Sequence, residues 1–248
     1  MKKVILVTGA SRGIGAEIAL QAGRQGWRVG VNYLHSEVEA QAVVAQIRAA
    51  GGEAVLLQAD VGQQPQVQAK FQQLDQAFGP INVLVNNAGV LTNFRVDTVN
   101  EEQLAHVFRA NVYSAYFCAR EAIVRMSTAL GGKGGAIINM SSVAARLGGL
   151  GGGAAYAASK GAIDSFNLAL AKEVGAEGIR VNAIRPGLIS TAMHEVHGGM
   201  ARMEQMAKTA VPLGRAGTVA EVAEVALWLA SDAASYVHGS VIDVAGGR

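Results

Sequence analysis

The sequence predicts a single α/β domain built on a doubly wound parallel sheet of about seven strands, with helices on both faces. Short, continuous apolar runs alternate along the whole chain with longer segments of helical periodicity. Strands that are buried on both faces of a parallel sheet have this continuous apolar pattern. No repeat, charge block or linker divides the 248 residues. We therefore expect one domain over residues 1–248.

The apolar runs begin with VILVT near the N-terminus and end with VIDV near the C-terminus. We expect strands at residues 4–8, 28–33, 54–59, 82–87, 136–140, 180–184 and 241–244. The helical periodicity predicts helices at residues 13–25, 37–50, 65–78, 101–130, 155–176 and 218–231. Ligands of such sheets bind beyond the carboxyl ends of the strands, so the residues that follow each strand are the candidates for a site.

The composition excludes several classes of protein. Half of the residues are hydrophobic and 16% are charged, which indicates a well-buried protein with further surface hidden in an oligomer. A formal net charge of +2 is too small to indicate a nucleic acid or a membrane surface as partner. No segment approaches the roughly 18 apolar residues that cross a bilayer. Cys118 is the only cysteine, so we expect it to pack in a helix of a cytoplasmic protein.

A glycine-rich turn, TGASRGIG at residues 8–15, follows the first expected strand and opens the first helix. Gly9 permits the sharp turn, while Gly13 and Gly15 permit close approach of a pyrophosphate to the helix N-terminus. A glycine triplet between a strand and a helix predicts a dinucleotide site.

The residues at the end of the second expected strand favour NADP over NAD as the cofactor. An acidic residue there binds the adenosine ribose in NAD-preferring sites, but VNYLHS at residues 31–36 contains none. Arg12, in the glycine turn, supplies a cation for a 2′-phosphate; a solvated loop residue is the alternative interpretation. Further expected contacts are Asn32, Tyr33, His35 and Ser36.

Two motifs further along the chain, NMSS at 139–142 and YAASK at 156–160, predict proton-transfer chemistry. Tyr156 and Lys160 are four residues apart, so both project from one face of a helix. We expect the ammonium to lower the pKa of the Tyr156 phenol, which is about 10 in a free tyrosine. Ser142 could hold a substrate oxygen while Tyr156 gives or takes its proton. These groups suit the reduction of a carbonyl or the oxidation of an alcohol.

On these motifs the chain resembles the short-chain dehydrogenase/reductase family over essentially all of its length. The resemblance extends to AD at 59–60, NNAG at 86–89, Asn111, PG at 186–187 and GSVIDVAGG at 239–247. It implies a Rossmann-type fold and hydride transfer between a nicotinamide dinucleotide and a carbonyl or secondary alcohol. The more specific resemblance is to bacterial, NADP-dependent 3-oxoacyl-(acyl-carrier-protein) reductases.

Docking of an acidic carrier protein requires basic residues at the mouth of the pocket, and Arg120, Arg125 and Lys133 are candidates. Glu177, however, stands before Gly178 where those enzymes often carry a basic residue. Sugar, polyol, steroid-like and small xenobiotic carbonyls therefore stay open as substrates.

The resemblance implies a role for each catalytic residue. Tyr156 is the general acid/base, Ser142 anchors the substrate oxygen, and Lys160 is the partner of the phenol and a ligand of the nicotinamide ribose. Asn111 resembles the helix-interrupting asparagine of the family, whose backbone holds a water in a proton relay. Ser141 is interpreted as structural.

The glycine turn and the resemblance together give the expected cofactor contacts. Asp60 resembles the residue that contacts adenine, with a helix cap as the alternative. The full set is Gly9, Ser11, Arg12, Gly13, Ile14, Gly15, Asn32, Tyr33, His35, Ser36, Asp60, Val61, Asn87, Ala88, Gly89, Tyr156, Lys160, Pro186, Gly187, Ile189 and Thr191.

Residues 190–212 hold four of the seven methionines and are expected to form a substrate lid, with a packed amphipathic helix as the alternative. His194 and His197 do not indicate a metal site, because no further ligand cluster accompanies them. In the family, helices that correspond to 101–130 and 155–176 pack between subunits, so we expect a homotetramer, with a dimer as the second possibility.

Three other functions stay open. A sugar or polyol dehydrogenase of the same family has the same motifs. Epimerases and dehydratases that act on nucleotide sugars share YxxxK, but they have a differently spaced glycine turn and an additional C-terminal region. A non-catalytic dinucleotide-binding regulator would lack Ser142, Tyr156 or Lys160, and all three are present.

Overall fold

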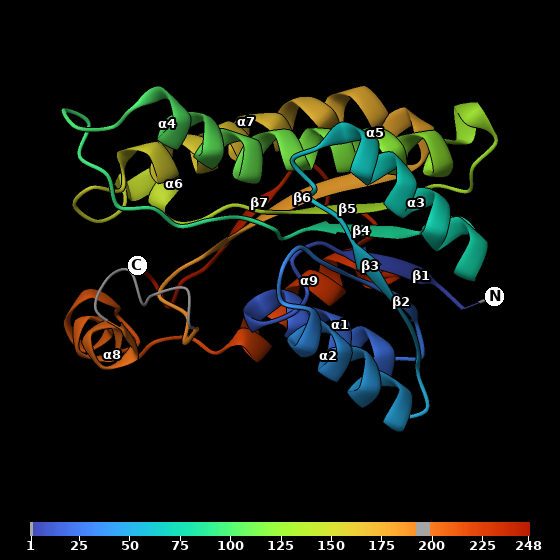
Figure 1. Cartoon of the computed structure of the whole chain (residues 1–248), viewed down its shortest axis with the longest axis horizontal. Coiled ribbons are helices and arrows are strands. Elements are labelled where there is room, and N and C mark those ends of the chain that lie inside the picture. The colour runs from blue at the N-terminus through green and yellow to red at the C-terminus, as the bar shows by residue number, and fades with distance from the viewer. Residues whose placement is uncertain (1, 192–198) are drawn as a thin grey trace.

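The computed structural model describes residues 2–191 and 199–248. Within them a single sheet of seven parallel strands has the order β3-β2-β1-β4-β5-β6-β7 (Figure 1). The strands are β1 (Val4–Val7), β2 (Arg28–Tyr33), β3 (Glu53–Gln58), β4 (Val83–Asn86), β5 (Gly135–Met140), β6 (Ile179–Pro186) and β7 (Val241–Val244). Every expected strand is present, with ends that differ by at most two residues, and the predicted fold class is confirmed.

Helices cover both faces of the sheet. Figure 1 shows α1, α2 and α9 on one face and α3, α5 and α7 on the other. The α-helices are α1 (Gly13–Arg24), α2 (Glu37–Ala49), α3 (Gln64–Phe78), α4 (Glu101–Phe108), α5 (Ser114–Met126), α6 (Ala144–Leu147), α7 (Ala154–Val174), α8 (Gly199–Ala210) and α9 (Val219–Ala230). A π-helical turn, η1 (Arg109–Tyr113), separates α4 from α5, and short 3₁₀ turns are η2 (Thr128–Leu130), η3 (Gly175–Glu177) and η5 (Asp232–Ala234).

The apolar runs supply two hydrophobic cores, one on each side of the sheet. In β1, Ile5 and Val7 face the core beneath α1, α2 and α9, while Val4 and Leu6 face the core beneath α3, α5 and α7. All four side chains are buried. Alternation of this kind explains why the strand is apolar at every position, since successive side chains point to opposite faces.

The core beneath α3 and α5 contains one lysine, which was not anticipated from the sequence. Lys70 of α3 is 1% exposed, and its Nζ lies 3.4 Å from Sγ of the fully buried Cys118 on α5. Burial lowers the pKa of the Lys70 amine and raises that of the Cys118 thiol, in each case against a smaller opposing effect of the partner. Cys118 therefore packs in a helix as expected, beside a nitrogen that the core disfavours in its charged form.

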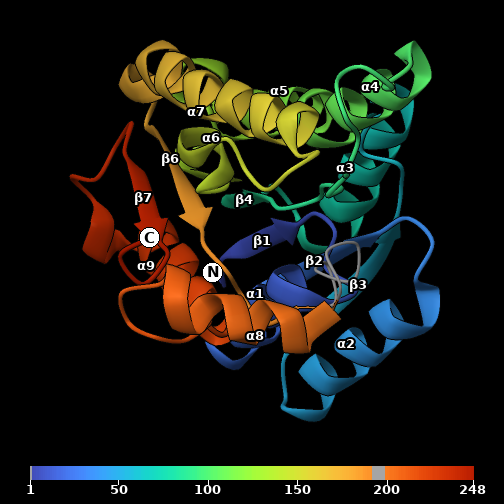
Figure 2. The ribbon, with the colours of Figure 1, turned by 90° about the vertical axis from the view of Figure 1, so that its left-hand side faces the viewer.

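The order of the strands fixes where a ligand can bind. In the sheet, β2 lies on one side of β1 and β4 lies on the other. The connection that leaves β1 leads toward β2 and the connection that leaves β4 leads toward β5, so these two connections diverge. A crevice at the carboxyl ends of strands opens at such a switch point. Figure 2 views the molecule from the end at which α8 lies, and the turn after β1 comes to this end.

Much of the expected lid is a packed helix in the structure. In α8, Met203 is 2% exposed and lies in a small hydrophobic cluster with Leu188, Ala207 and Val211. This burial agrees with the alternative interpretation of a packed amphipathic helix for the described part of 190–212. Met193, His194 and His197 lie outside the described residues.

Candidate active site

The glycine turn has the backbone shape that the sequence predicts. Gly9 and Gly13 have φ angles of +63° and +60°, which residues with a side chain rarely adopt. A Cβ at Gly9 would lie 3.0 Å from Cα of Ala88, and one at Gly15 would overlap the side-chain amide of Asn87. The two glycines therefore serve the packing of the turn, Gly9 against Ala88 and Gly15 against Asn87, a reason that the sequence did not reveal.

Thr8 joins the two loops that meet at the switch point. Its Oγ1 accepts hydrogen bonds from the backbone N–H groups of Asn87 (2.9 Å) and Ala88 (3.0 Å). The Asn87 side-chain amide donates in return to the carbonyls of Thr8 and Gly9. Sequence reasoning missed Thr8, although a buried hydroxyl between a strand and a glycine is a signal for such a lock.

Asn32, at the end of β2, has its hydrogen-bonding capacity taken up by the protein. Its Nδ2 donates to the carbonyls of Leu57 (2.9 Å) and Ala59 (3.2 Å), and its Oδ1 accepts from the Gly9 N–H (3.2 Å). Asn32 is 2% exposed and ties the ends of β1, β2 and β3 together. Any contribution to cofactor binding is thus through the shape of the glycine turn rather than through its own amide.

The other expected adenosine contacts lie around this end of the sheet. Arg12 is the exposed residue that precedes α1, Tyr33 is buried, His35 is exposed, and Ser36 precedes α2. Arg12 forms no ion pair within residues 2–191 and 199–248. After β3, Oδ1 of Asp60 accepts from the Gly62 N–H at 2.8 Å. The helix that follows begins after Gln63, so Asp60 closes a turn and does not cap it.

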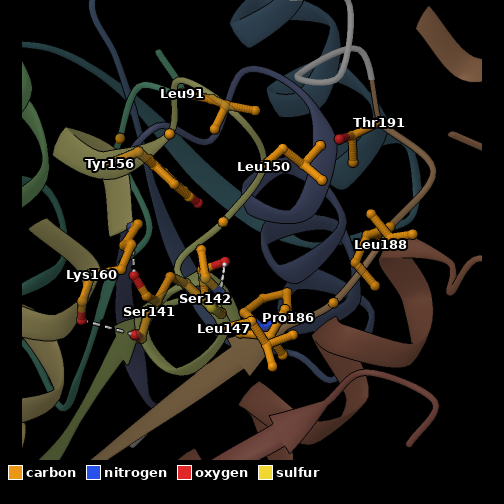
Figure 3. Close-up of a pocket in the computed structure, with 18 of the residues that line it drawn as sticks. Leu91, Ser141, Ser142, Leu147, Leu150, Tyr156, Lys160, Pro186, Leu188 and Thr191 are labelled. Atoms are coloured by element: carbon orange, nitrogen blue, oxygen red, sulfur yellow. Dashed lines mark hydrogen bonds between the residues drawn. The ribbon is translucent and has the colours of Figure 1, made fainter. Parts of the chain in front are cut away.

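Three of the expected catalytic residues, Ser142, Tyr156 and Lys160, line one cavity, whose volume is about 130 Å³. Asn111 is not among its lining residues. Ser142 follows β5, and Tyr156 and Lys160 lie one turn apart in α7 (Figure 3). Oγ of Ser142 accepts a hydrogen bond from the Ala144 N–H at 3.1 Å, which fixes the oxygen. The hydroxyl of Ser141 instead donates to the Lys160 carbonyl at 3.1 Å and pins α7 to β5, in agreement with a structural role.

The pKa of Tyr156 is shifted opposite to expectation in this structure. Burial raises it above its usual value, and Ser142 opposes the rise only in part. The ammonium of Lys160, 5.7 Å from the centre of the Tyr156 ring, is itself desolvated. Burial lowers the pKa of Lys160 to about 8, although Asp164 acts in the opposite direction. The expectation was wrong because it counted the attraction between the two groups and omitted their shared desolvation.

Asn111 lies at the centre of η1 and is 2% exposed. Its Nδ2 donates to the Val90 carbonyl (3.0 Å) and to Oγ of Ser159 (2.9 Å), and its Oδ1 accepts from the Val90 N–H (2.7 Å). The side chain thus joins η1 to α7 and to the loop after β4. The interruption of a predicted helix at Asn111 is confirmed, and it takes the form of a π-helical turn.

Several residues that the sequence predicts as cofactor contacts also line the cavity. Ile14, Asn87, Gly89, Pro186, Gly187, Ile189 and Thr191 are among its lining residues. A Cβ at Gly89 would lie 3.0 Å from Oδ1 of Asn111 and 3.5 Å from Nζ of Lys160. Gly89 therefore leaves room directly beside Asn111 and Lys160. Ser11, Val61 and Ala88 are not among the lining residues.

Among the residues that the structure describes, no group of three His, Cys, Asp or Glu side chains could hold a metal ion. No described helix is long and apolar enough to cross a membrane.

A Rossmann-like sheet with a glycine turn at its switch point, and with serine, tyrosine and lysine around one adjoining cavity, defines a class of oxidoreductases. A family model described as Enoyl-(Acyl carrier protein) reductase matches residues 9–248. The chain belongs to the short-chain dehydrogenase/reductase family.

Curated relatives match along nearly their whole length. The chain is 48% identical over 246 residues to the uncharacterized oxidoreductase YgfF of Escherichia coli, which covers 99% of both chains. It is 41% identical over 256 residues to versicolorin reductase 1 of Aspergillus parasiticus, with 99% of this chain and 95% of the relative covered. It is 38% identical over 247 residues to the 3-oxoacyl-(acyl-carrier-protein) reductase FabG of Staphylococcus aureus, with 100% and 98% covered.

Proposed function

We propose that this oxidoreductase transfers a hydride between NADP(H) and a carbonyl or secondary alcohol, with Tyr156 as general acid/base. The observation that carries the proposal is the single cavity that Ser142, Tyr156 and Lys160 share with residues from the glycine-turn side of the sheet, Ile14, Asn87 and Gly89. The names of two relatives, versicolorin reductase and 3-oxoacyl-(acyl-carrier-protein) reductase, support carbonyl reduction as the direction.

The residues at the switch point fit a dinucleotide. Gly9 and Gly13 hold left-handed backbone at the N-terminus of α1, where amide groups attract a pyrophosphate. Arg12 is exposed beside them and suits a 2′-phosphate. Residues 87–89 suit the wall of the adenosine ribose, and Pro186, Gly187, Ile189 and Thr191, which line the cavity, suit the nicotinamide carboxamide. When it is bound, NADPH supplies the hydride that reduces the substrate carbon.

The protein's own residues handle the substrate oxygen and its proton. Ser142 donates a hydrogen bond to this oxygen, since its Oγ is held by the Ala144 N–H and its hydroxyl hydrogen, which also interacts with the Tyr156 phenol, can rotate toward the substrate. Tyr156 donates its proton to the same oxygen during reduction, and its raised pKa keeps the phenol protonated at neutral pH. Lys160 stabilises the phenolate that remains.

The lining of the cavity favours a substrate with an apolar part. Leu91, Leu147, Leu150 and Leu188 all line it, and Figure 3 shows them around Ser142 and Tyr156. A small ketone or the acyl part of a 3-oxoacyl thioester suits such a wall. Arg125 is unsuited to docking a carrier protein, because it is paired with Asp75 (2.7 Å) and Glu121 (2.9 Å).

The test is oxidation of NADPH and, in parallel, of NADH by the purified protein. The panel contains acetoacetyl thioesters, diketones, quinones and sugar-derived carbonyls. Turnover with NADPH supports the proposal. Turnover with sugar-derived carbonyls alone would instead favour a sugar or polyol dehydrogenase. Tight NADPH binding without turnover on this panel or, in reverse, on alcohols with NADP would favour a non-catalytic regulator.

The preference for NADPH is expected to depend on Arg12. Arg12→Ala should raise the KM for NADPH about tenfold or more, because a hydrogen bond to a charged group is lost, while the KM for NADH changes little. Arg24→Ala is the matched control, since Arg24 is an exposed cation at the other end of the same helix. Equal effects of Arg12→Ala on both cofactors would contradict the assignment of Arg12 to the 2′-phosphate.

We also propose that the protein assembles as a homotetramer through α5 and α7. Tyr113, Tyr116 and Val124 are 50%, 51% and 54% exposed, and Leu168 of α7 is 49% exposed. The ring of Tyr116 packs 4.1 Å from that of Phe166, so this apolar stripe runs across both helices. Such exposed patches mark interaction surfaces.

Light scattering after gel filtration tests this assembly. The wild type is expected at the mass of four chains, and Val124→Glu combined with Leu168→Glu at a smaller mass. Val96→Glu, in the loop before α4, is the control, because Val96 is 74% exposed and lies off the stripe. A wild type that elutes as a monomer, or a double variant that stays tetrameric, would rule out this surface.

A further inference from the structure

Asp164 lies one turn beyond Lys160 on α7 and binds Arg185 of β6. Its Oδ2 accepts from Nε of Arg185 at 2.9 Å and lies 2.8 Å from Nη2. The other oxygen, Oδ1, is buried and has no hydrogen-bond partner among the described residues. Since a carboxylate normally has its buried oxygens satisfied, this charge is held in place at a cost in desolvation.

The pairing continues from Arg185 to the rim of the substrate cavity. Arg185 also lies 3.4 Å from Asp243 of β7, and Asp243 lies 3.1 Å from Arg146 of α6. Arg146 in turn donates to the carbonyl of Arg248 at 2.8 Å, and Arg248 lines the cavity. A set of ion pairs, continued by one hydrogen bond to a backbone carbonyl, therefore joins Asp164 to the cavity wall.

Lys160 has few other polar neighbours. Its side chain is 5% exposed, and its Nζ donates to the Met140 carbonyl at 2.8 Å. The neighbour from η1, Asn111, is neutral, and Arg109 of the same turn packs against Gly62. The charged residues of α4 are exposed, and β5 carries none. On its own helix, the neighbours of Lys160 one turn away are Tyr156, whose ring centre lies 5.7 Å from Nζ, and Asp164, whose charge raises the pKa of Lys160.

We propose that Asp164, oriented by Arg185, is a positioning residue that keeps Lys160 charged in its buried place beside Tyr156. A buried ammonium bound only to a carbonyl loses its proton readily, and a fixed negative charge one helical turn away opposes that loss. Asp164 does not touch the substrate. It acts through Lys160, and Arg185 prevents the carboxylate from turning away.

The chain offers a close control for this pair. Asp75 of α3 binds Arg125 of α5 at 2.7 Å through one oxygen, and its Oδ1 is likewise buried without a partner among the described residues. Asp75→Asn and Asp164→Asn therefore remove the same kind of ion pair, but only Asp164 lies beside Lys160. Asp164→Glu keeps the carboxylate at the site.

The first experiment is independent of the proposed function. Lysines of the ligand-free protein are acetylated with acetic anhydride over a range of pH, and the rate at Lys160 is measured by mass spectrometry. Asp164→Asn is expected to lower the pH at which Lys160 becomes reactive by roughly one unit. Asp164→Glu and Asp75→Asn should keep the wild-type midpoint. An unchanged midpoint in Asp164→Asn, or equal shifts in the Asn and Glu variants of Asp164, would overturn the proposal.

The second experiment rests on the proposed function. The alkaline limb of kcat/KM for carbonyl reduction should move to lower pH in Asp164→Asn by the same amount, and stay in place in Asp75→Asn. A shifted midpoint in the acetylation experiment together with no turnover in the wild type would leave Asp164 in its role toward Lys160 and reject the reductase alone. If the acetylation midpoint moves in Asp164→Asn but the alkaline limb of the kcat/KM profile does not, then Asp164 has no role in the reaction.

Discussion

Tyr156→Phe is expected to lower kcat for carbonyl reduction by about 10²–10⁴-fold, the usual loss when a positioned proton donor is removed. The ring that lines the cavity is retained, so substrate and cofactor should bind nearly as before. The loss should therefore appear in kcat and in kcat/KM to a similar extent. Steady-state kinetics and a separate fluorescence titration with NADPH distinguish the two effects.

Tyr236→Phe is the control for this substitution, because Tyr236 is fully exposed and lies outside the cavity. It should leave all rate constants unchanged. A Tyr156→Phe protein that retains wild-type kcat would require another proton donor and would remove the central residue of the proposed mechanism.

The directions of the two pKa shifts predict opposite pH dependence for the two reactions. Reduction needs the protonated phenol and a charged Lys160. Because the pKa of Lys160 is about 8, the rate of reduction should be level near neutral pH and fall at higher pH, where Lys160 loses its proton. Alcohol oxidation needs the phenolate, which burial disfavours, so its rate should rise with pH. These profiles are measured with NADPH and NADP, respectively.

Lys70→Met is expected to stabilise the protein by about 2 kcal/mol at neutral pH, since an apolar side chain of similar length replaces a buried amine. Sγ of Cys118, the partner that is left behind, is a weak hydrogen-bonding group, so little is lost. Urea denaturation measures the change. Lys133→Met is the control, because Lys133 is exposed and its replacement should change stability little.

The pH dependence of this stability has a definite sign. The pKa of Lys70 is lower in the folded than in the unfolded chain, so between the two values the unfolded chain binds more protons. Stability must then rise with pH in that window, and the cost of Lys70 grows as pH falls toward the folded pKa. Lys70→Met should make the free energy of unfolding less dependent on pH in this window. A wild type and variant with parallel stability curves would show that Lys70 keeps its proton in the core.

Local patterns were sufficient for the fold because the central strands β1, β4 and β5 are buried on both faces, which makes them apolar at most positions. They were insufficient where the structure depends on contacts between distant residues. Lys70 sits in an amphipathic helix, where the sequence does not distinguish a solvated lysine from a buried one. The pairing of Asp164 with Arg185 arises only when α7 packs on β6.

The candidate catalytic residues were recognisable because their spacing and order resemble a family, and the structure places Ser142, Tyr156 and Lys160 around one cavity. Their electrostatics were not recognisable in this way. The direction of the Tyr156 pKa depends on how much water the fold removes from the phenol, which the four-residue spacing does not contain. Thr8 was missed for a similar reason, since its partners lie 79 and 80 residues away.

The π-helical turn η1 makes the number of residues before Asn111 as important as their identity. Each residue of an α-helix advances the chain by about 100° around the axis. Because the π turn already spreads one extra residue over about the same rotation, deleting one residue within Arg109–Tyr113 would restore a regular helix with little change in the angular phase between α4 and α5. Val107, the buried contact of α4, could keep its place in the core, but the widened turn that holds Asn111 against Val90 and Ser159 would be lost. Sequence alignments and loop grafts in this region therefore have to preserve residue count through η1.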